Sequence, residues 1–345
     1  MENITIMTPD GIVEAPRKPD CDPAVSVKRL NFSYSSRLIL KELNFDFYPG
    51  EIFGFLGPNG SGKTTTIKLI LGLLPISSGR ITVCGYDVKT QFESAMAQVG
   101  GIVENPEMYS YLTGRQNLEI FRRMFDSVPK ERIDELAELV GLSDRIGDKV
   151  SKYSLGMRQR LGIAQALLGD PKVLVLDEPT NGLDPAGIKD LRDLLIKLSR
   201  EKNVAVFVSS HQLAELDLMC DRVAVINSGR ILRVLTMEEI RNPGGNGEIE
   251  LTVDIAPETA GNIPEDCPLK LADGKLVGSV TEESVPSIIA SLAAAGVSIT
   301  GVNRKQRTLE DVFLELTRSN PIDRPIWAPP VKIPSEENKE GGEAK

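Results

Sequence analysis

The sequence is poor in the residues from which metal centres and disulfide frameworks are built. It has one histidine, His211, and four cysteines among 345 residues, and no two cysteines are spaced as C-x-x-C. Zinc sites and small disulfide-linked scaffolds need closely spaced Cys or His residues. These absences argue against a zinc module and against a disulfide framework.

Long apolar runs and an excess of positive charge are also missing. No window approaches the roughly 18 apolar residues of a membrane-spanning helix, and residues 1–20 lack the basic start and apolar run of a signal peptide. The net charge is −9 and the pI is about 5.0. Because an acidic protein is poorly suited to neutralising phosphates along a nucleic acid, we expect no nucleic-acid partner. We expect a soluble, cytoplasmic chain of about two domains.

The hydropathy pattern divides the chain into two domains flanked by polar tails. Residues 1–22 and 320–345 are polar and aperiodic, so we expect disordered tails there. Between them, a turn-rich Asn-Pro-Gly-Gly linker separates a domain over residues 23–241 from a small α+β domain over residues 248–318. Residues 106–170 show helical periods, which indicates a helical insertion in the first domain.

The strands expected in the first domain are of two kinds. Leu43, Phe45 and Phe47 alternate with polar residues, which is typical of a half-buried strand in an antiparallel sheet. Residues 173–176 and 204–208 are continuous apolar runs, which are typical of parallel strands covered on both faces. The sequence therefore predicts an α/β fold with a mostly parallel sheet, an antiparallel β subdomain and a separate C-terminal α+β domain.

A glycine-rich loop follows the expected strand over residues 52–56 and precedes a helix that contains Ile67. It fits the pattern G-x-x-x-x-G-K-[ST], in which backbone N–H groups and a helix N-terminus surround phosphates. We expect Lys63 to reach the outer phosphates and the Thr64 hydroxyl to ligate Mg²⁺. The alternative is a glycine-rich turn with a chance Lys-Thr pair. The expected phosphate-binding residues are Gly57, Pro58, Asn59, Gly60, Ser61, Gly62, Lys63, Thr64 and Thr65.

Two acids and the single histidine follow the two buried strands. Asp177 and Glu178 end one strand, at the sheet edge where open α/β sheets bind their ligands. We expect Asp177 to hold Mg²⁺ and Glu178 to accept a proton from an attacking water. His211 follows the other strand, where it can hydrogen-bond a γ-phosphate or orient that water. The expected catalytic set consists of Lys63, Glu178 and His211. The alternatives are acids that only cap a strand and a structural histidine.

The order of these elements resembles the ATP-binding subunit of ATP-binding-cassette (ABC) transporters over residues 24–235. Tyr34 matches the aromatic residue that stacks on adenine in that family. Residues 153–157 (Tyr-Ser-Leu-Gly-Met) stand where the LSGGQ signature belongs, residues 181–184 match the D-loop, and His211 matches the switch histidine. The resemblance implies a P-loop ABC ATPase that binds ATP and Mg²⁺ and hydrolyses ATP.

The resemblance also implies a second ATPase subunit. In the family, the signature serves the nucleotide of the partner subunit, so Ser154, Gly156 and Asp184 are expected at the partner's ATP. Since the chain has one P-loop and one signature, it needs a second copy or a paralogue, as a homodimer or a heterodimer. Leu155 and Met157 depart from the signature pattern. A helix cap without a ligand is the alternative for Ser154.

Glu104 stands where the family has its Q-loop glutamine. The resemblance makes Glu104 a further metal-associated residue, and an exposed loop acid is the alternative. Apolar residues follow it in the helical insertion, and they form either a groove for a permease helix or the insertion's own small core. These residues are Tyr109, Tyr111, Leu112, Phe121, Met124 and Phe125.

The amino-acid sequences of three segments narrow the resemblance to one group within the family. Residues 104–106, 153–164 and 308–313 are similar to those of ATPases from bacterial multidrug and bacitracin-type peptide-antibiotic exporters. In that group separate integral-membrane permeases form the path, which places the ATPase at the inner face of the cell membrane. Two alternative functions are those of a soluble ABC-type ATPase that acts on nucleic acid or ribosomes and of a regulatory cassette that does not hydrolyse ATP. The first alternative typically has long coiled-coil insertions, zinc modules or a second cassette. The sequence shows none of these features.

Overall fold

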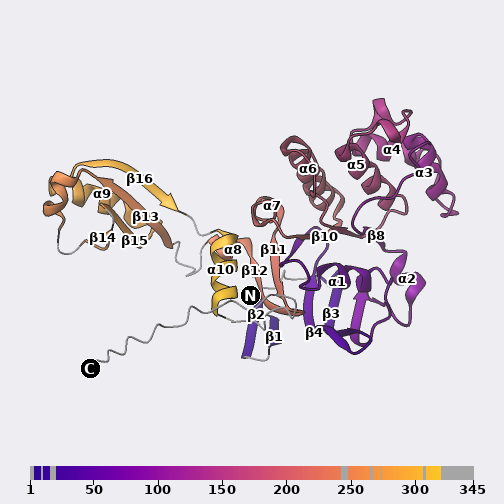
Figure 1. Cartoon of the computed structure of the whole chain (residues 1–345), viewed down its shortest axis with the longest axis horizontal. Helices are drawn as coiled ribbons and strands as arrows, with labels where there is room; N and C mark the ends of the chain where they lie inside the picture. The colour runs from indigo at the N-terminus through magenta and orange to yellow at the C-terminus, as the bar shows by residue number, and fades with distance from the viewer. Residues whose placement is uncertain are drawn as a thin grey trace, which may run out of the picture.

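The structure is a computed structural model, and it describes residues 4–8, 11–15, 21–241, 248–264, 267–272, 274–305 and 308–319. Figure 1 shows a larger body built around two sheets and a smaller body, in orange, built from β13 to β16 and α9. Within the described residues, no helix is both long enough and apolar enough to cross a membrane. The predicted tail over residues 320–345 lies outside the described residues.

Two short strands lie within the segment for which the sequence predicts an irregular N-terminal tail. β1 (Ile4–Thr8) pairs antiparallel with β2 (Gly11–Ala15), with Ile4 opposite Ala15. The start of β1 alternates isoleucine with threonine, and such alternation favours an extended strand. The polar composition of residues 1–22 hides this local pattern.

The central sheet has the strand order β12-β11-β5-β10-β9-β8, and every pair in it is parallel except β11 with β12. All residues of β5, β9 and β10 are buried. Helices or a second sheet cover both faces of these strands, which is why their sequences are continuously apolar. The bounds are β5 (Ile52–Leu56), β8 (Val99–Ile102), β9 (Val173–Asp177), β10 (Ala205–Ser210), β11 (Arg222–Asn227) and β12 (Arg230–Thr236).

The antiparallel subdomain is a second sheet with the order β4-β3-β6-β7. Phe45 and Phe47 of β4 stack on Phe53 of β5 with ring centroids 5.7 and 5.6 Å apart, which ties the two sheets together. Ile67 of α1 lies in the same apolar cluster, so α1 packs between the sheets. The bounds are β3 (Val25–Tyr34), β4 (Arg37–Phe47), α1 (Lys63–Ile70), β6 (Ser78–Val83), β7 (Tyr86–Asp87) and α2 (Phe92–Met96).

Helices cover the other face of the central sheet and form the insertion expected over residues 106–170. Leu118, Ile133 and Leu161 of the insertion share one apolar cluster with Leu174 and Leu176 of β9. The insertion contains α3 (Gly114–Arg122), α4 (Arg132–Leu139), η1 (Ser143–Arg145), η2 (Val150–Lys152) and α5 (Leu155–Ala166). This body also contains α6 (Pro185–Lys202), α7 (Leu213–Met219) and α8 (Met237–Arg241).

The smaller body is an antiparallel sheet with the order β14-β15-β13-β16 and its own apolar core. Leu251 and Val253 of β13 pack with Leu276 of β15 and Leu292 of α9. Its elements are β13 (Glu248–Ile255), η3 (Pro257–Asn262), β14 (Lys270–Ala272), β15 (Lys275–Thr281), η4 (Glu282–Ser284), α9 (Val285–Ala294) and β16 (Ile299–Lys305).

The last helix, α10 (Leu309–Ser319), packs on the larger body, against α7 and α8. The sequence predicts this helix over residues 309–316 as the end of the C-terminal domain. Leu309 and Val312 instead belong to the apolar cluster of the first domain, and Figure 1 shows α10 beside α8. Helical periodicity reveals the apolar face of α10, but it does not reveal which neighbour covers that face.

Candidate functional site

The loop between β5 and α1 has a backbone that only glycine fits at two positions. Gly62, the N-cap of α1, has a φ of 111°, a region that side chains with a Cβ avoid. At Gly57, a Cβ would lie 2.3 Å from the carbonyl oxygen of Ile226 on the neighbouring strand. The glycines of the motif are therefore required by conformation and by space.

Backbone hydrogen bonds hold this loop in place. Ser61 N donates to Pro58 O at 3.2 Å, and Gly229 N donates to Ser61 O at 2.9 Å. Lys63 is only 6% exposed, and its Nζ donates to Gly57 O at 2.8 Å. The loop is thus folded around the lysine ammonium.

Lys63, Glu178 and His211 meet at one edge of the central sheet. Lys63 Nζ lies 3.3 Å from Glu178 Oε1, and His211 Nδ1 lies 2.7 Å from Glu178 Oε2. The three residues follow or flank β5, β9 and β10, which are adjacent parallel strands whose carboxyl ends share that edge. The structure therefore brings together the three residues that the sequence predicts as catalytic.

Asp177 and Glu178 are linked to a residue that the sequence analysis missed, Ser209 at the end of β10. Ser209 Oγ donates to Asp177 Oδ1 at 2.6 Å and accepts from Glu178 N at 3.0 Å. Asp177 is 1% exposed, and within the described part of the chain its Oδ2 has no hydrogen-bond partner. A hydroxyl residue that precedes His211 was the available signal, but its partner depends on strand register.

Two of the predicted residues lie apart from this cluster. Tyr34, at the end of β3, is 48% exposed, and its ring makes a T-shaped contact with Phe32 at a centroid distance of 4.8 Å. Glu104 follows β8, and its side chain is 70% exposed and 4.0 Å from Lys68 Nζ. Among the described residues, no hydrogen bond or ion pair joins Glu104 to Asp177. The metal role of Glu104 stays a prediction.

The signature residues lie at the start of α5, in front of the start of α6. Ser154 caps α5 by accepting from Met157 N at 3.2 Å, and Asp184 caps α6 by accepting from Gly187 N at 3.1 Å. Together with Gly156, they line a cavity of about 150 Å³ between the two helices. The cavity thus lies at two helix N-termini, which attract anions, and its lining also holds the charged side chains of Arg160, Asp184 and Asp190.

Tyr153 anchors the signature to the helical insertion. Its hydroxyl donates to Arg145 O at 2.7 Å, and burial of the ring raises the pKa of Tyr153 above its usual value. On the other side, Leu155 Cδ2 lies 3.0 Å from the position that a Cβ on Gly182 would take. The leucine that departs from the signature pattern therefore packs against the D-loop of its own chain.

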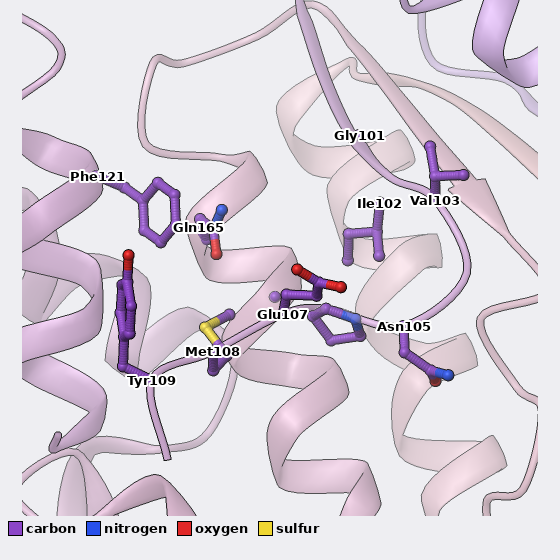
Figure 2. Close-up of a pocket in the computed structure, with 11 residues that line it drawn as sticks. Gly101, Ile102, Val103, Asn105, Glu107, Met108, Tyr109, Phe121 and Gln165 are labelled. Carbon is purple, nitrogen blue, oxygen red and sulfur yellow. The ribbon is translucent and has the colours of Figure 1, made fainter. Parts of the chain in front are cut away.

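A larger pocket of about 490 Å³ lies between β8 and the helical insertion. Figure 2 shows Tyr109 and Phe121 on one side of it and Ile102 and Val103 on the other. Asn117 fixes the loop between them by accepting from Tyr109 N at 2.9 Å and donating to Tyr109 O at 3.1 Å. Of the apolar residues for which the sequence leaves two roles open, four are more than a third exposed: Tyr109, Tyr111, Met124 and Phe125.

The comparisons with known proteins point to one family. The sequence family described as ABC transporter matches residues 40–181. The ABC transporter ATP-binding protein YhcH of Bacillus subtilis (strain 168) is 46% identical over 293 residues, which cover 85% of this chain and 95% of that protein. The bacitracin transport ATP-binding protein BcrA of Bacillus licheniformis is 44% identical over 60% of this chain and 68% of its own.

A solved structure is similar in fold. It is that of CbiO1 from Clostridium perfringens, described as part of the ABC transporter complex CbiONQ, with a TM-score of 0.59 and 29% identity. The similarity covers 64% of this chain and 90% of that one, and the fold class predicted from the sequence is confirmed. By these matches, and by identity along most of the length of YhcH, the chain belongs to the ATP-binding proteins of ABC transporters.

Proposed function

We propose that this ABC ATPase closes as a dimer around two Mg²⁺-bound ATP molecules and so drives a separate membrane permease, most simply an exporter of drugs or peptide antibiotics. The observation that carries the proposal is the meeting of Lys63, Glu178 and His211 at one sheet edge. As a member of the ABC ATPases, the chain hydrolyses ATP. The dimer, the permease and the exported compound form the proposed part.

The phosphates of ATP are expected in the loop of residues 57–65, with adenine on the ring of Tyr34, which is partly exposed. Lys63 is nearly buried and already paired with an anion, the Glu178 carboxylate. A phosphate that takes Lys63 as its partner would compete with this carboxylate, because two anions close to one ammonium repel each other. Phosphate binding would then free Glu178 to act on water.

The residues at this edge fit Mg²⁺, a hard cation that prefers oxygen ligands. Asp177 Oδ2 is a buried oxygen without a hydrogen-bond partner among the described residues, and Thr64 in the first turn of α1 offers a hydroxyl. These two side chains would hold the metal. When bound, Mg²⁺ neutralises charge on the phosphates.

Glu178 and His211 are suited to handle the attacking water. In the proposed reaction, Glu178 accepts a proton from the water, as a general base must lie within hydrogen-bond reach of its substrate. The contact of His211 Nδ1 with Glu178 leaves the Nε2 atom of a 40% exposed imidazole for the γ-phosphate or the water. His211 would thus orient the base and the reacting group together.

The second subunit would complete each site. The cavity lined by Ser154, Gly156 and Asp184 presents two helix N-termini, and this arrangement suits the phosphates of a nucleotide held by another copy's loop. The homodimer and the heterodimer with a paralogue both satisfy this requirement.

The pocket of Figure 2 is the surface that we assign to the permease. Met108, Tyr109 and Phe121 supply its apolar and aromatic part, and a groove with such residues can take a short helix. Asn105, Glu107 and Gln165 add polar groups to the lining. The chain would then sit at the cytoplasmic face of the membrane. Its similarity to a bacitracin transport ATP-binding protein supports export of a peptide antibiotic or a related compound.

The variant Glu178→Gln tests the catalytic and dimeric parts of the proposal. It keeps the size of the side chain but removes the base, so we expect turnover to fall by about 10²–10⁴-fold while ATP still binds. With Mg²⁺ and ATP, the variant should accumulate as a dimer in analytical ultracentrifugation.

The control is Glu138→Gln, the same change at an exposed position of α4. It should hydrolyse ATP as fast as the wild type and should not accumulate as a dimer. Near-normal turnover of Glu178→Gln would refute the assignment of the base, and a monomer in saturating ATP would refute closure. Recovery of a polytopic membrane protein with the tagged chain would support the permease.

A further inference from the structure

One hydroxyl group contacts both acidic residues of the proposed site. Ser209 is fully buried, and the register of β10 on β9 places it opposite Asp177. Its Oγ donates to Asp177 Oδ1 at 2.6 Å and accepts from Glu178 N at 3.0 Å. A serine hydroxyl has one donor and two acceptor positions, so a single side chain serves both acids.

Glu178 depends on this contact because of its backbone. Its φ is 48°, a left-handed conformation that few residues other than glycine adopt. Its N–H is held by two oxygens of the same residue, Ser209 Oγ at 3.0 Å and Ser209 O at 3.2 Å. This conformation directs the carboxylate to Lys63 and His211.

Asp177 depends on the hydroxyl because of its burial. With Oδ1 bonded to Ser209, the carboxylate is fixed in one orientation, and Oδ2 is left as the oxygen available to a cation. Without the hydroxyl, neither oxygen of this buried carboxylate would have a hydrogen-bond partner in the part of the chain that the structure describes. Rotation about the terminal bond would then be unrestrained.

We propose that Ser209 is a positioning residue that sets both the metal-facing oxygen of Asp177 and the backbone of Glu178. Ser209 contacts neither the metal nor the reacting groups in this scheme, and it acts through the two acids. The inference rests on the proposed roles of Asp177 and Glu178. It adds a residue that links metal binding to placement of the base.

The test compares Ser209→Ala with Ser210→Ala in the full chain. Ser210 is the next residue on β10 and is equally buried, but its hydroxyl accepts from Gln212 N at 2.9 Å and not from the acids. Mn²⁺ serves as the probe, and its binding in the presence of ATP is followed by electron paramagnetic resonance. ATP binding is measured separately in EDTA.

We expect Ser209→Ala to weaken Mn²⁺ binding by about 10–100-fold, as loss of a residue behind a metal ligand does. Turnover should fall as well, whereas ATP affinity in EDTA should stay unchanged. Ser210→Ala should bind Mn²⁺ like the wild type. The variant Ser209→Thr retains the hydroxyl, and where it folds it should recover Mn²⁺ affinity.

Equal Mn²⁺ affinity of Ser209→Ala and Ser210→Ala would overturn the inference. If the wild-type chain binds ATP but takes up no Mn²⁺ when the metal is supplied, the proposed metal site itself would be wrong. This outcome differs from equal Mn²⁺ affinities of the two variants, so the two failures are distinct. Thermal unfolding of each variant separates a local effect from loss of the fold.

Discussion

At the level of single residues, the room around the backbone limits which residue the phosphate-binding loop accepts at Gly57. Gly57 has no room for a side chain, because a carbonyl oxygen of β11 lies 2.3 Å from the position of a Cβ. Gly85, in the turn after β6, has a φ of +84° and open space around it. The two glycines therefore separate a steric requirement from a conformational one.

We expect Gly57→Ala to reduce ATP affinity at least tenfold, since the loop must move away from Ile226 to accept the methyl group. ATP titration by calorimetry measures this. Gly85→Ala should destabilise the fold by about 1–2 kcal/mol, the cost of a left-handed conformation, and leave ATP affinity unchanged. Equal ATP affinities of the two variants would contradict the steric argument.

At the scale of elements, the pairing of neighbouring strands assembles the site. The register of β9 on β10 sets Asp177 opposite Ser209, and a shift by one residue would turn these side chains to opposite faces. The apolar face of α10 is another case, because it joins the first domain although the chain has already passed through the second. The C-terminal body is thus tied to the first domain at both of its ends, next to α7 and α8.

We expect Leu309→Ala to lower the free energy of unfolding by about 2–5 kcal/mol, because Leu309 is 1% exposed in the cluster beneath α10. Urea denaturation provides the measurement. The matched control is Leu314→Ala on the same helix, where the side chain is 41% exposed and the expected change is below about 0.5 kcal/mol. Similar losses for both variants would refute the packing of α10 described here.

At the level of the whole molecule, one chain carries two separate sites. These are the loop of residues 57–65 and the cavity lined by Ser154, Gly156 and Asp184. The proposed dimer would combine the loop of one copy with the signature of the other. A substitution in the loop and one in the signature would then damage different composite sites. Gly156 is a suitable position, because the nearest atom to a Cβ there, Leu183 Cδ2, is an ordinary 3.8 Å away.

We expect Lys63→Ala and Gly156→Asp to be inactive alone and to regain ATP hydrolysis when mixed. In the mixed dimer, one site has an intact loop from one chain and an intact signature from the other. A coupled-enzyme assay of phosphate release measures the recovery.

The control mixture is Lys63→Ala with Glu178→Gln. Lys63 and Glu178 of one chain act at the same ATP, the one bound by the loop of that chain. Each site of this mixed dimer therefore carries one defect, and the mixture should stay inactive. Recovery in both mixtures, or in neither, would contradict composite sites built from two copies of this chain.

Local sequence determined the fold class, the phosphate-binding loop and the three residues that meet at the sheet edge. Lys63 lies in a motif whose spacing is itself the signal, and Glu178 and His211 each follow a continuous apolar strand. Because parallel strands present their carboxyl ends at one edge, strand type alone was enough to bring these residues together. The family resemblance, drawn from the order of the motifs, was confirmed by the comparisons.

The tertiary structure alone decided which residues support that site and where the last helix lies. Ser209 became visible only through the register of β9 and β10, which no local pattern specifies. The pairing of β1 with β2 and the partner of α10 likewise depend on contacts that composition and periodicity do not specify. The physical reason is that periodicity reports which face of an element is buried, whereas contacts between distant segments depend on how the whole chain packs.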